Sequence, residues 1–234
     1  MKADHYDAFA ASYEAENASS LLNAYYERPA MIRLAGDVSG RQILDAGCGS
    51  GFLTAELRGK GAVMTGLDGS PAMVELARSR LGDDVPLHVA DLAQPLPFAT
   101  DTFDDVTASL VLHYLQNWEA PLTEFKRVLK PGGRLILSVN HPTVHLFNYP
   151  DEDYFATRQY SEDYDFNGEP AVLTFWHRPL HAMTSAFTDA GFNISVLDEP
   201  EPSPHTPHHL LTPRIAAGER TAFLCFIFFV LTAS

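Results

Sequence analysis

The sequence predicts an α/β protein built on one doubly wound, largely parallel sheet. Between Arg41 and Val139, short apolar runs alternate with segments whose apolar residues recur at helical spacing. The run RLILSVN at 134–140 is strongly apolar, which is typical of a strand covered by helices on both faces. Repeated strand–helix units of this length favour parallel pairing through right-handed crossovers. A chain of 234 residues has the length of a single large domain.

The first two strand–helix units occupy residues 42–82. QILDA at 42–46 is predicted to be a strand, and glycines separate it from a helix that carries Leu53 and Leu57 on one face. AVMTGLD at 62–68 is the second strand. The next helix begins at Ser70-Pro71, an N-cap followed by a first-turn proline, and ends near Gly82.

The following units continue the alternation. LHVAD at 87–91 and DVTASL at 105–110 are predicted strands. The next helix carries apolar residues at helical spacing, namely Leu122, Phe125, Val128 and Leu129. It stops at the Pro-Gly-Gly sequence of 131–133, and the strand at 134–140 follows.

The two ends of the chain differ from this middle part. Residues 1–37 carry helical patterns, including YDAFAASYE at 6–14, and predict an N-terminal helical cover. Residues 141–171 are polar and aromatic without a regular period, and we interpret the insertion at 141–178 as a lid that binds the acceptor of a reaction. The remaining predicted elements are a helix from Pro179 to Gly191, a strand at 193–197, a Pro/His-rich loop at 199–209 and an apolar strand at 221–231.

The composition excludes several classes of partner. Sixteen basic residues against 30 acidic residues give a net charge of −14, and such a surface repels nucleic acid. The two cysteines, Cys48 and Cys225, predict no disulfide framework. Charged residues interrupt the N-terminal segment where a signal peptide would be apolar, and the apolar run at 222–231 is shorter than the ~20 residues of a membrane helix. We therefore expect a cytoplasmic protein with neither a nucleic-acid nor a membrane partner, and nothing in the sequence specifies its oligomeric state.

The segment ILDAGCGSG at 43–51 is the most informative motif. A predicted strand ends at Asp45, and glycines follow at alternate positions before a helix begins. Glycines at this place let the backbone bend sharply and approach a ligand closely. The dinucleotide fingerprint is G-x-G-x-x-G, whereas the third glycine here, Gly51, comes one residue earlier.

Acidic residues end three successive predicted strands. They are Asp45, Asp68 and Asp91. Single aspartates at strand ends often cap the following helix, but three beside a glycine loop favour a ligand that is cationic and carries no phosphate. A carboxylate at the position of Asp68 can also accept both hydroxyls of a ribose.

These motifs together resemble the class I S-adenosylmethionine-dependent methyltransferases, and within them the UbiE-like small-molecule group. The segments that carry the resemblance are ILDAGCGSG, GLDGS at 66–70, HVADLAQPLPF at 88–98, FDDVTASLVLHYL at 103–115 and RVLKPGGRLILSV at 127–139. The resemblance implies a Rossmann-like, seven-stranded sheet in the order 3-2-1-4-5-7-6 with an antiparallel last strand. It also implies an enzyme that uses S-adenosyl-L-methionine and releases S-adenosyl-L-homocysteine.

The resemblance further assigns cofactor contacts. The loop from Asp45 through Gly47 and Gly49 to Gly51 would wrap the methionine part, with the Gly47 carbonyl near its ammonium group. Asp68 would hold the ribose hydroxyls. The remaining implied contacts are Gly69 and Ser70 beside the adenosine, Asp91 and Leu92 at the adenine, Ser109 beside the methionine part, and Tyr13 closing over the cofactor.

The acceptor of the methyl group is expected to be a small molecule with an aromatic or apolar body, because the lid is rich in aromatic residues. Methyl transfer needs a base only when the acceptor is protonated, and histidine has a suitable pKa for that role. Candidates follow the predicted fifth and fourth strands, His141 and His113, with His177 ranked next and His181 last. Each of them can equally be a structural histidine.

Three alternatives stay open at this point. One is a binding module that holds the cofactor without turnover, another is an NAD-dependent oxidoreductase, and a third is a protein methyltransferase. The His-rich loop with His205, His208 and His209 lacks a matching carboxylate cluster, so no metal site is predicted.

Overall fold

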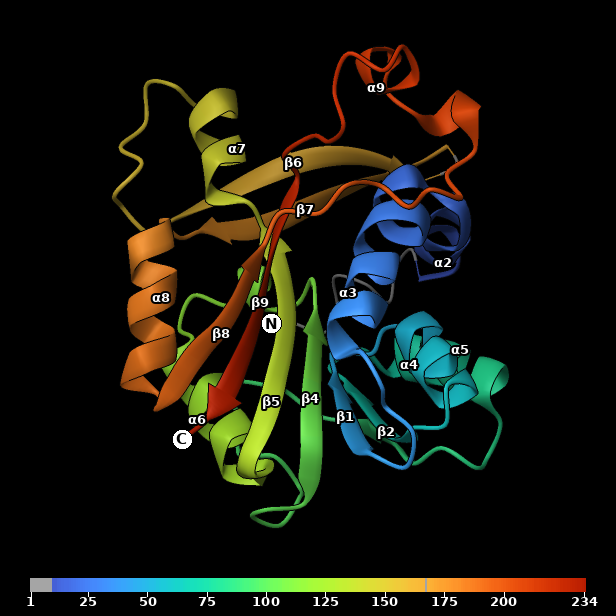
Figure 1. Cartoon of the computed structure of the whole chain (residues 1–234), viewed down its shortest axis with the longest axis vertical. Coiled ribbons are helices and arrows are strands. Elements are labelled where there is room, and N and C mark those ends of the chain that lie inside the picture. Colours follow the sequence, from blue (N-terminus) through green and yellow to red (C-terminus); the bar gives the residue numbers. More distant parts are fainter. Residues whose placement is uncertain (1–9, 167) are drawn as a thin grey trace.

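The computed structural model describes residues 10–166 and 168–234 and has a seven-stranded sheet at its centre (Figure 1). The order of the strands is β3-β2-β1-β4-β5-β9-β8. Their bounds are β1 Gln42–Ala46, β2 Val63–Asp68, β3 Leu87–Val89, β4 Phe103–Ser109, β5 Leu129–Asn140, β8 Phe192–Asp198 and β9 Phe226–Ala233. Strands β1 to β5 pair in parallel, whereas β9 is antiparallel to both β5 and β8.

This topology confirms the expected Rossmann-like sheet. When the strands of the sheet alone are numbered along the chain, their order is the predicted 3-2-1-4-5-7-6 with an antiparallel last strand. The last strand begins at Phe226, five residues later than the start predicted at 221. Its sequence FIFFVLTA is buried along almost its whole length, which explains why both of its faces are apolar.

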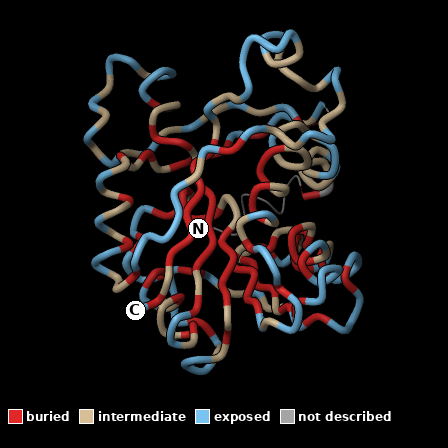
Figure 2. The backbone as a smooth tube through the Cα atoms, viewed as in Figure 1, coloured by how far each residue is buried: buried red, intermediate tan, exposed pale blue. Residues whose placement is uncertain are grey.

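Helices cover both faces of the sheet (Figure 1). Their bounds are α2 Ala10–Ser19, α3 Arg28–Ala35, α4 Phe52–Gly59, α5 Pro71–Leu81, α6 Glu119–Val128, α7 Pro142–Asn148, α8 Leu180–Asp189 and α9 Pro213–Ala216. Short turns of helix are the π-helical η1 Asn23–Glu27, η2 Leu112–Tyr114 and η3 His208–Leu210. Residues of α6 and α8 share one core cluster with the sheet, and residues of α3, α4 and α5 share another. The buried residues concentrate between these layers (Figure 2).

The insertion after β5 has regular structure, which corrects the expectation that residues 141–171 lack it. Helix α7 is followed by an antiparallel hairpin of β6, Arg158–Phe166, and β7, Glu169–His177. The signal is present in the sequence, because Tyr160, Tyr164 and Phe166 fall on one face of an alternating strand. In Figure 1 the hairpin crosses the end of the sheet at which β4 and β5 finish.

The N-terminal part is helical where it is described, with α2, η1 and α3 in succession. The predicted N-terminal cover at 1–37 begins outside the described residues. The first four residues of the YDAFAASYE segment, 6–9, also lie outside them. Within the described part of the chain, no helix is long and apolar enough to cross a membrane.

Candidate functional site

The glycine loop after β1 is shaped by close packing against the loop that follows β4. Gly47 has a φ of +80°, and a Cβ atom there would lie 2.6 Å from Cγ2 of Val111. The amides of Gly47 and Cys48 both donate to the carbonyl of Leu67 at the end of β2, at 2.8 and 2.9 Å. Any side chain at position 47 would therefore be strained and would clash.

Asp68 ties the end of β2 to this loop. Its Oδ2 accepts a hydrogen bond from the Gly49 amide at 2.9 Å, and its Oδ1 accepts one from the Ser70 amide at 2.8 Å. The residue is 7% exposed. Two backbone donors thus hold the carboxylate in a fixed orientation beside the glycine loop.

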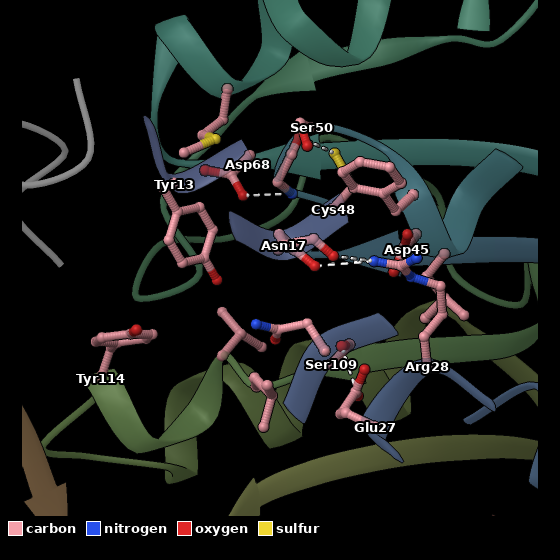
Figure 3. Close-up of a pocket in the computed structure, with 18 residues that line it drawn as sticks. Tyr13, Asn17, Glu27, Arg28, Asp45, Cys48, Ser50, Asp68, Ser109 and Tyr114 are labelled. Carbon is pink, nitrogen blue, oxygen red and sulfur yellow. Dashed lines mark hydrogen bonds between the residues drawn. The ribbon is translucent and has the colours of Figure 1, made fainter. Parts of the chain in front are cut away.

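A pocket, here called the first pocket, opens between the glycine loop, the end of β4 and the N-terminal helices (Figure 3). Six of the residues predicted to contact a cofactor line it, namely Tyr13, Asp45, Gly47, Gly49, Asp68 and Ser109. They come from α2, β1, the glycine loop after β1, β2 and β4, so only the folded chain brings them together.

Asp45 is a buried acid at the base of this pocket. Its carboxylate accepts hydrogen bonds from the hydroxyls of Thr54 at 2.5 Å and Thr107 at 2.8 Å, and 1% of the residue is exposed. Burial raises the pKa of Asp45, although the two hydroxyls oppose that rise. Within the described part of the chain, no guanidinium is bonded to this acid.

Several polar residues of the first pocket were not identified from the sequence, among them Asn17, Glu27 and Arg28. An Arg28 guanidinium nitrogen, Nη2, donates to the backbone oxygen of Asn17 at 2.8 Å and to its Oδ1 at 2.9 Å. Glu27 accepts from the hydroxyls of Ser109 and Ser138. The only sequence signal was a set of polar residues within a helical pattern, and such a pattern does not indicate which helix faces the glycine loop.

A narrow pocket continues from the other side of Gly47 and Asp68. The predicted residues Gly69, Asp91 and Leu92 line it. Asp91 follows β3, and its Oδ1 accepts from the Ala93 amide at 3.0 Å. The narrow pocket and the first pocket share Gly47, Asp68 and Val111, so they form adjoining parts of one cleft.

Two further predicted contact residues lie behind this cleft rather than in the lining of either part. Gly51 has a φ of +82° at the start of α4, and a Cβ atom there would lie 3.3 Å from Cβ of Ala77 in α5. Ser70 is fully buried and caps α5, where its hydroxyl accepts from the Met73 amide at 3.1 Å. Both residues therefore support the loops that form the cleft.

An aromatic pocket lies between the end of the sheet and the hairpin. Its lining includes Asn140, Tyr160, Tyr164, Phe166, Leu173 and Phe175. It shares Tyr13, Asn23, Leu110 and Tyr114 with the first pocket, so the two are neighbours. The hairpin residues form a small core cluster of their own, against which Tyr13 and Tyr114 pack.

The predicted bases His113 and His141 line the aromatic pocket. His113 accepts a hydrogen bond from the Asn140 amide at Nδ1, at 3.1 Å, and burial lowers its pKa to about 3. In the neutral ring, Nε2 of His113 therefore carries the proton. Nδ1 of His141 accepts from the Thr143 amide at 3.1 Å, and its Nε2 lies 2.6 Å from Oε1 of Glu199.

His177 lies outside the lining of the aromatic pocket. Its Nε2 is 2.8 Å from the carbonyl oxygen of Tyr154, and its ring stacks on that of His145 at 4.0 Å. His145 itself lines the aromatic pocket and was not among the predicted bases. Burial lowers the pKa of both His145 and His177. His181, the last-ranked candidate, lies in the first turn of α8.

No group of three or more His, Cys, Asp or Glu side chains is arranged to hold a metal ion among residues 10–166 and 168–234. The loop with His205, His208 and His209 falls within this described part.

Part of the chain is similar to known methyltransferases. Residues 44–137 match a family described as a methyltransferase domain. The chain is 35% identical over 135 residues to the demethylmenaquinone methyltransferase of Lactococcus lactis, which covers 55% of this chain and 54% of that protein. The chain spans about half the length of the first curated relatives that it matches.

Solved structures agree over more of the chain. A chain from Haloferax volcanii, solved in complex with the Trm112 methyltransferase activator, has a TM-score of 0.72 and 26% identity, with 100% of this chain and 97% of that chain covered. An S-adenosylmethionine-dependent methyltransferase from Mesorhizobium loti has a TM-score of 0.65 and 24% identity, with 87% and 96% covered.

Proposed function

We propose that the chain is a class I S-adenosylmethionine-dependent methyltransferase that transfers a methyl group to a small acceptor with an aromatic body, because residues 44–137 match a methyltransferase domain and the chain resembles methyltransferases in sequence and fold. The observation that carries this proposal is the contact between the two pockets. Tyr13, Asn23, Leu110 and Tyr114 line both the first pocket, beside the glycine loop, and the aromatic pocket under the hairpin. A methyl donor and an aromatic acceptor bound in them would meet at the end of β4.

The cleft suits S-adenosylmethionine in its chemistry. Asp68, held by two backbone donors, would accept the ribose hydroxyls, and Asp91 with the Leu92 amide would face the adenine in the narrow pocket. The Gly47 carbonyl would lie near the ammonium group, and Arg28 would pair with the carboxylate of the methionine part. The bound cofactor supplies a methyl group on a positively charged sulfur.

The main task of the protein in this reaction is positioning. Holding two reactants about 3 Å apart in line can supply roughly 7–11 kcal/mol of the barrier. The hairpin of β6 and β7 would act as the lid over the acceptor, since its apolar face closes the aromatic pocket and would exclude water. Tyr13 from α2 packs edge-on against Phe166 at 5.4 Å, so the N-terminal cover and the hairpin would close together.

A histidine base is the finer part of the proposal. His113 has Nε2 as its remaining ring nitrogen, and that atom is a donor as long as the Asn140 amide holds Nδ1. His141 would have to leave the Thr143 amide before it could accept a proton at Nδ1. Transfer to an amine, a carbanion or an oxygen that arrives ionised needs neither change, and we propose that acceptors of this kind react fastest.

Calorimetric titration with S-adenosylmethionine and S-adenosylhomocysteine tests the cofactor, with NAD as the competing ligand. We expect micromolar binding of the first two, weakened by about 1.5–3 kcal/mol in Asp68→Ala, which removes a charged hydrogen-bond acceptor. Asp83→Ala is the matched control, because Asp83 is exposed and lies outside the cleft. Heat from NAD alone would favour the oxidoreductase alternative and contradict the proposal.

The acceptor is tested by a transfer assay with labelled S-adenosylmethionine. The curated relatives named as demethylmenaquinone methyltransferases suggest hydroxylated aromatic rings, so the first panel contains 1,4-dihydroxynaphthalene, simple phenols and aromatic amines. Cofactor binding without transfer to any aromatic acceptor, together with an unchanged Kd when the acceptors are added, would favour a binding module over an enzyme.

A further inference from the structure

Glu27 is a buried acid of the first pocket that lies outside the glycine-loop motif. We infer that Glu27 is the counter-ion for the positively charged methionine part of the methyl donor, and that the donor binds with release of a proton from this side chain. The inference rests on the proposed function, because it concerns the same ligand. It assigns to the N-terminal cover a part in recognising the charge of the cofactor.

The carboxyl group of Glu27 is held at the carboxyl ends of two neighbouring strands. The Ser109 hydroxyl at the end of β4 donates to Oε1 at 2.7 Å, and the Ser138 hydroxyl of β5 donates to the same oxygen at 2.6 Å. The hydrogen bonds found among the described residues thus reach Oε1, and Oε2 is left for a ligand. Glu27 is 4% exposed and lines the first pocket, beside Ser109 in Figure 3.

The local backbone explains why an acid can occupy this buried position. Glu27 is the last residue of the π-helical turn η1, and such turns are frequent at functional sites. Its neighbour Tyr26 packs on the rings of Phe223 and Phe226, at 4.8 and 5.9 Å. The packing of Tyr26 against the sheet holds the turn in place, and Glu27 follows it into the pocket.

The charges around Glu27 leave it short of a positive partner. From its own segment, the guanidinium of Arg28 donates to Asn17 and stacks over the ring of Phe52 at 4.4 Å, and no ion pair joins it to Glu27 among the described residues. From β1, the acid Asp45 faces the same space. Charged or titratable groups of the other surrounding helices affect the pKa of Arg28. Glu56 of α4 and Tyr13 of α2 raise it, and Arg80 of α5 lowers it.

Burial raises the pKa of Glu27, and the two serine hydroxyls and Arg28 only partly oppose that rise. The acid therefore tends to hold its proton while the pocket is empty. A cation in the pocket favours the ionised carboxylate, so binding and proton loss are linked. Below the raised pKa, affinity for the cation must increase as the pH increases, and above it the dependence must level off.

An acid with a purely structural role would behave differently. If Glu27 served only to bridge Ser109 and Ser138, its protonation would be the same with and without the ligand. Its replacement would then alter the stability of the protein but not the number of protons released on binding.

Calorimetry in buffers of different ionisation enthalpy counts the protons released, using the full chain and three probes. S-adenosylmethionine carries both the sulfonium and the ammonium, S-adenosylhomocysteine carries only the ammonium, and methylthioadenosine carries neither. We expect proton release with the first probe and none with the third. Release with the second shows that the ammonium is the partner, and its absence shows that the sulfonium is.

Glu27→Gln keeps the shape of the side chain and an oxygen that can accept from both serines. We expect this variant to release no proton, and to bind S-adenosylmethionine roughly ten- to a hundredfold more weakly, as for the loss of a charge-assisted contact. Its affinity for methylthioadenosine should be unchanged, which also reports that the pocket is folded. Glu119→Gln, an exposed acid at the start of α6, is the matched control.

Equal proton release in Glu27→Gln and the unaltered chain would overturn the inference while leaving the proposed function intact. Equal release with methylthioadenosine would overturn it as well, because that probe has no positive charge to recognise. If the unaltered chain bound none of the adenosine probes, the proposed function itself would fail, and the inference with it.

Discussion

Buried acids at the two ends of the central sheet differ in whether they have a positively charged partner. At the amino end of β4, Asp105 is fully buried and is paired with two guanidinium groups, Arg134 Nε at 2.7 Å and Arg41 Nη2 at 2.8 Å. At the carboxyl end of the adjacent strand, Asp45 is almost equally buried, and its hydrogen-bond partners among the described residues are the hydroxyls of Thr54 and Thr107.

The pKa shifts follow this difference. Burial alone would raise the pKa of Asp105, but Arg134 and Arg41 lower it below its ordinary value of 3.8. Burial raises the pKa of Asp45 and of Glu27. The acid at one end is therefore neutralised by guanidinium groups of the protein itself, whereas the acids at the other end have hydroxyl partners, as the proposed binding of a cationic ligand requires.

The largest expected effect on stability comes from removing the ion pairs of Asp105. Asp105→Asn leaves two partly buried guanidinium groups without their charge partner, and we expect a loss of about 3–5 kcal/mol in the free energy of unfolding. Asp104→Asn is the matched control, because Asp104 is partly exposed and its ion pair with Lys130 contributes only about 0–1 kcal/mol. Urea denaturation of both variants measures the difference, and equal losses would contradict the comparison.

The next largest effect is expected from substitutions in the glycine loop at the carboxyl end of β1. Gly47→Ala places a Cβ atom 2.6 Å from Val111 at a φ of +80°, so we expect a loss of roughly 2–4 kcal/mol from strain and overpacking together. Gly36→Ala has a φ of +67° and open space around its Cβ position, so it measures the strain of a positive φ without overpacking, about 1–3 kcal/mol. Thermal unfolding of the two variants separates the cost of backbone strain from the cost of overpacking. Partial recovery in Gly47→Ala combined with Val111→Ala should follow.

The pH dependence of stability should have opposite signs at the two ends. Asp105 has a lowered pKa, so its stabilising effect is present at neutral pH and is lost as the pH falls below 3.8. Glu27 has a raised pKa, so the folded chain binds the extra proton and stability falls as the pH rises above 4.5 toward that raised value. Unfolding free energies measured from pH 3 to pH 8 should therefore show both slopes. Glu27→Gln should remove the contribution of Glu27 to the fall in stability above pH 4.5, and it should leave the loss below pH 3.8 unchanged.

The smallest expected effect concerns the support of the cleft. Ser70→Ala removes the hydroxyl that accepts from the Met73 amide at the start of α5, and N-cap losses of this kind cost about 1 kcal/mol. Ser79→Ala, at an exposed position of the same helix, is the control. A loss of about 1 kcal/mol corresponds to less than a tenfold change in an equilibrium constant. If Ser70→Ala weakened cofactor binding by more than that, Ser70 would be a direct contact with the cofactor rather than a support of the loop.

Some features that the sequence did not predict had a local signal. Strand β6 has Tyr160, Tyr164 and Phe166 on one face, but Glu162 interrupts that face and acidic residues on the other face obscured the alternation. His145 follows His141 at helical spacing, yet nothing in that spacing indicates that His177 would stack on it at 4.0 Å. Contacts between segments this far apart depend on how β7 returns to the sheet.

The sequence by itself determined the order of the elements and the glycine loop with its acids. Strand and helix periods, caps and turn residues act over a few positions, so Ser70 caps α5 and Gly47 makes its turn as local chemistry requires. Only the tertiary structure decided which acids meet a cation and which do not. Asp105 and Asp45 lie two positions apart in the register of neighbouring strands, and Glu27 reaches the same pocket from a helix before the sheet. Burial and charge depend on what packs around a carboxyl group, and chain neighbours alone do not specify that environment.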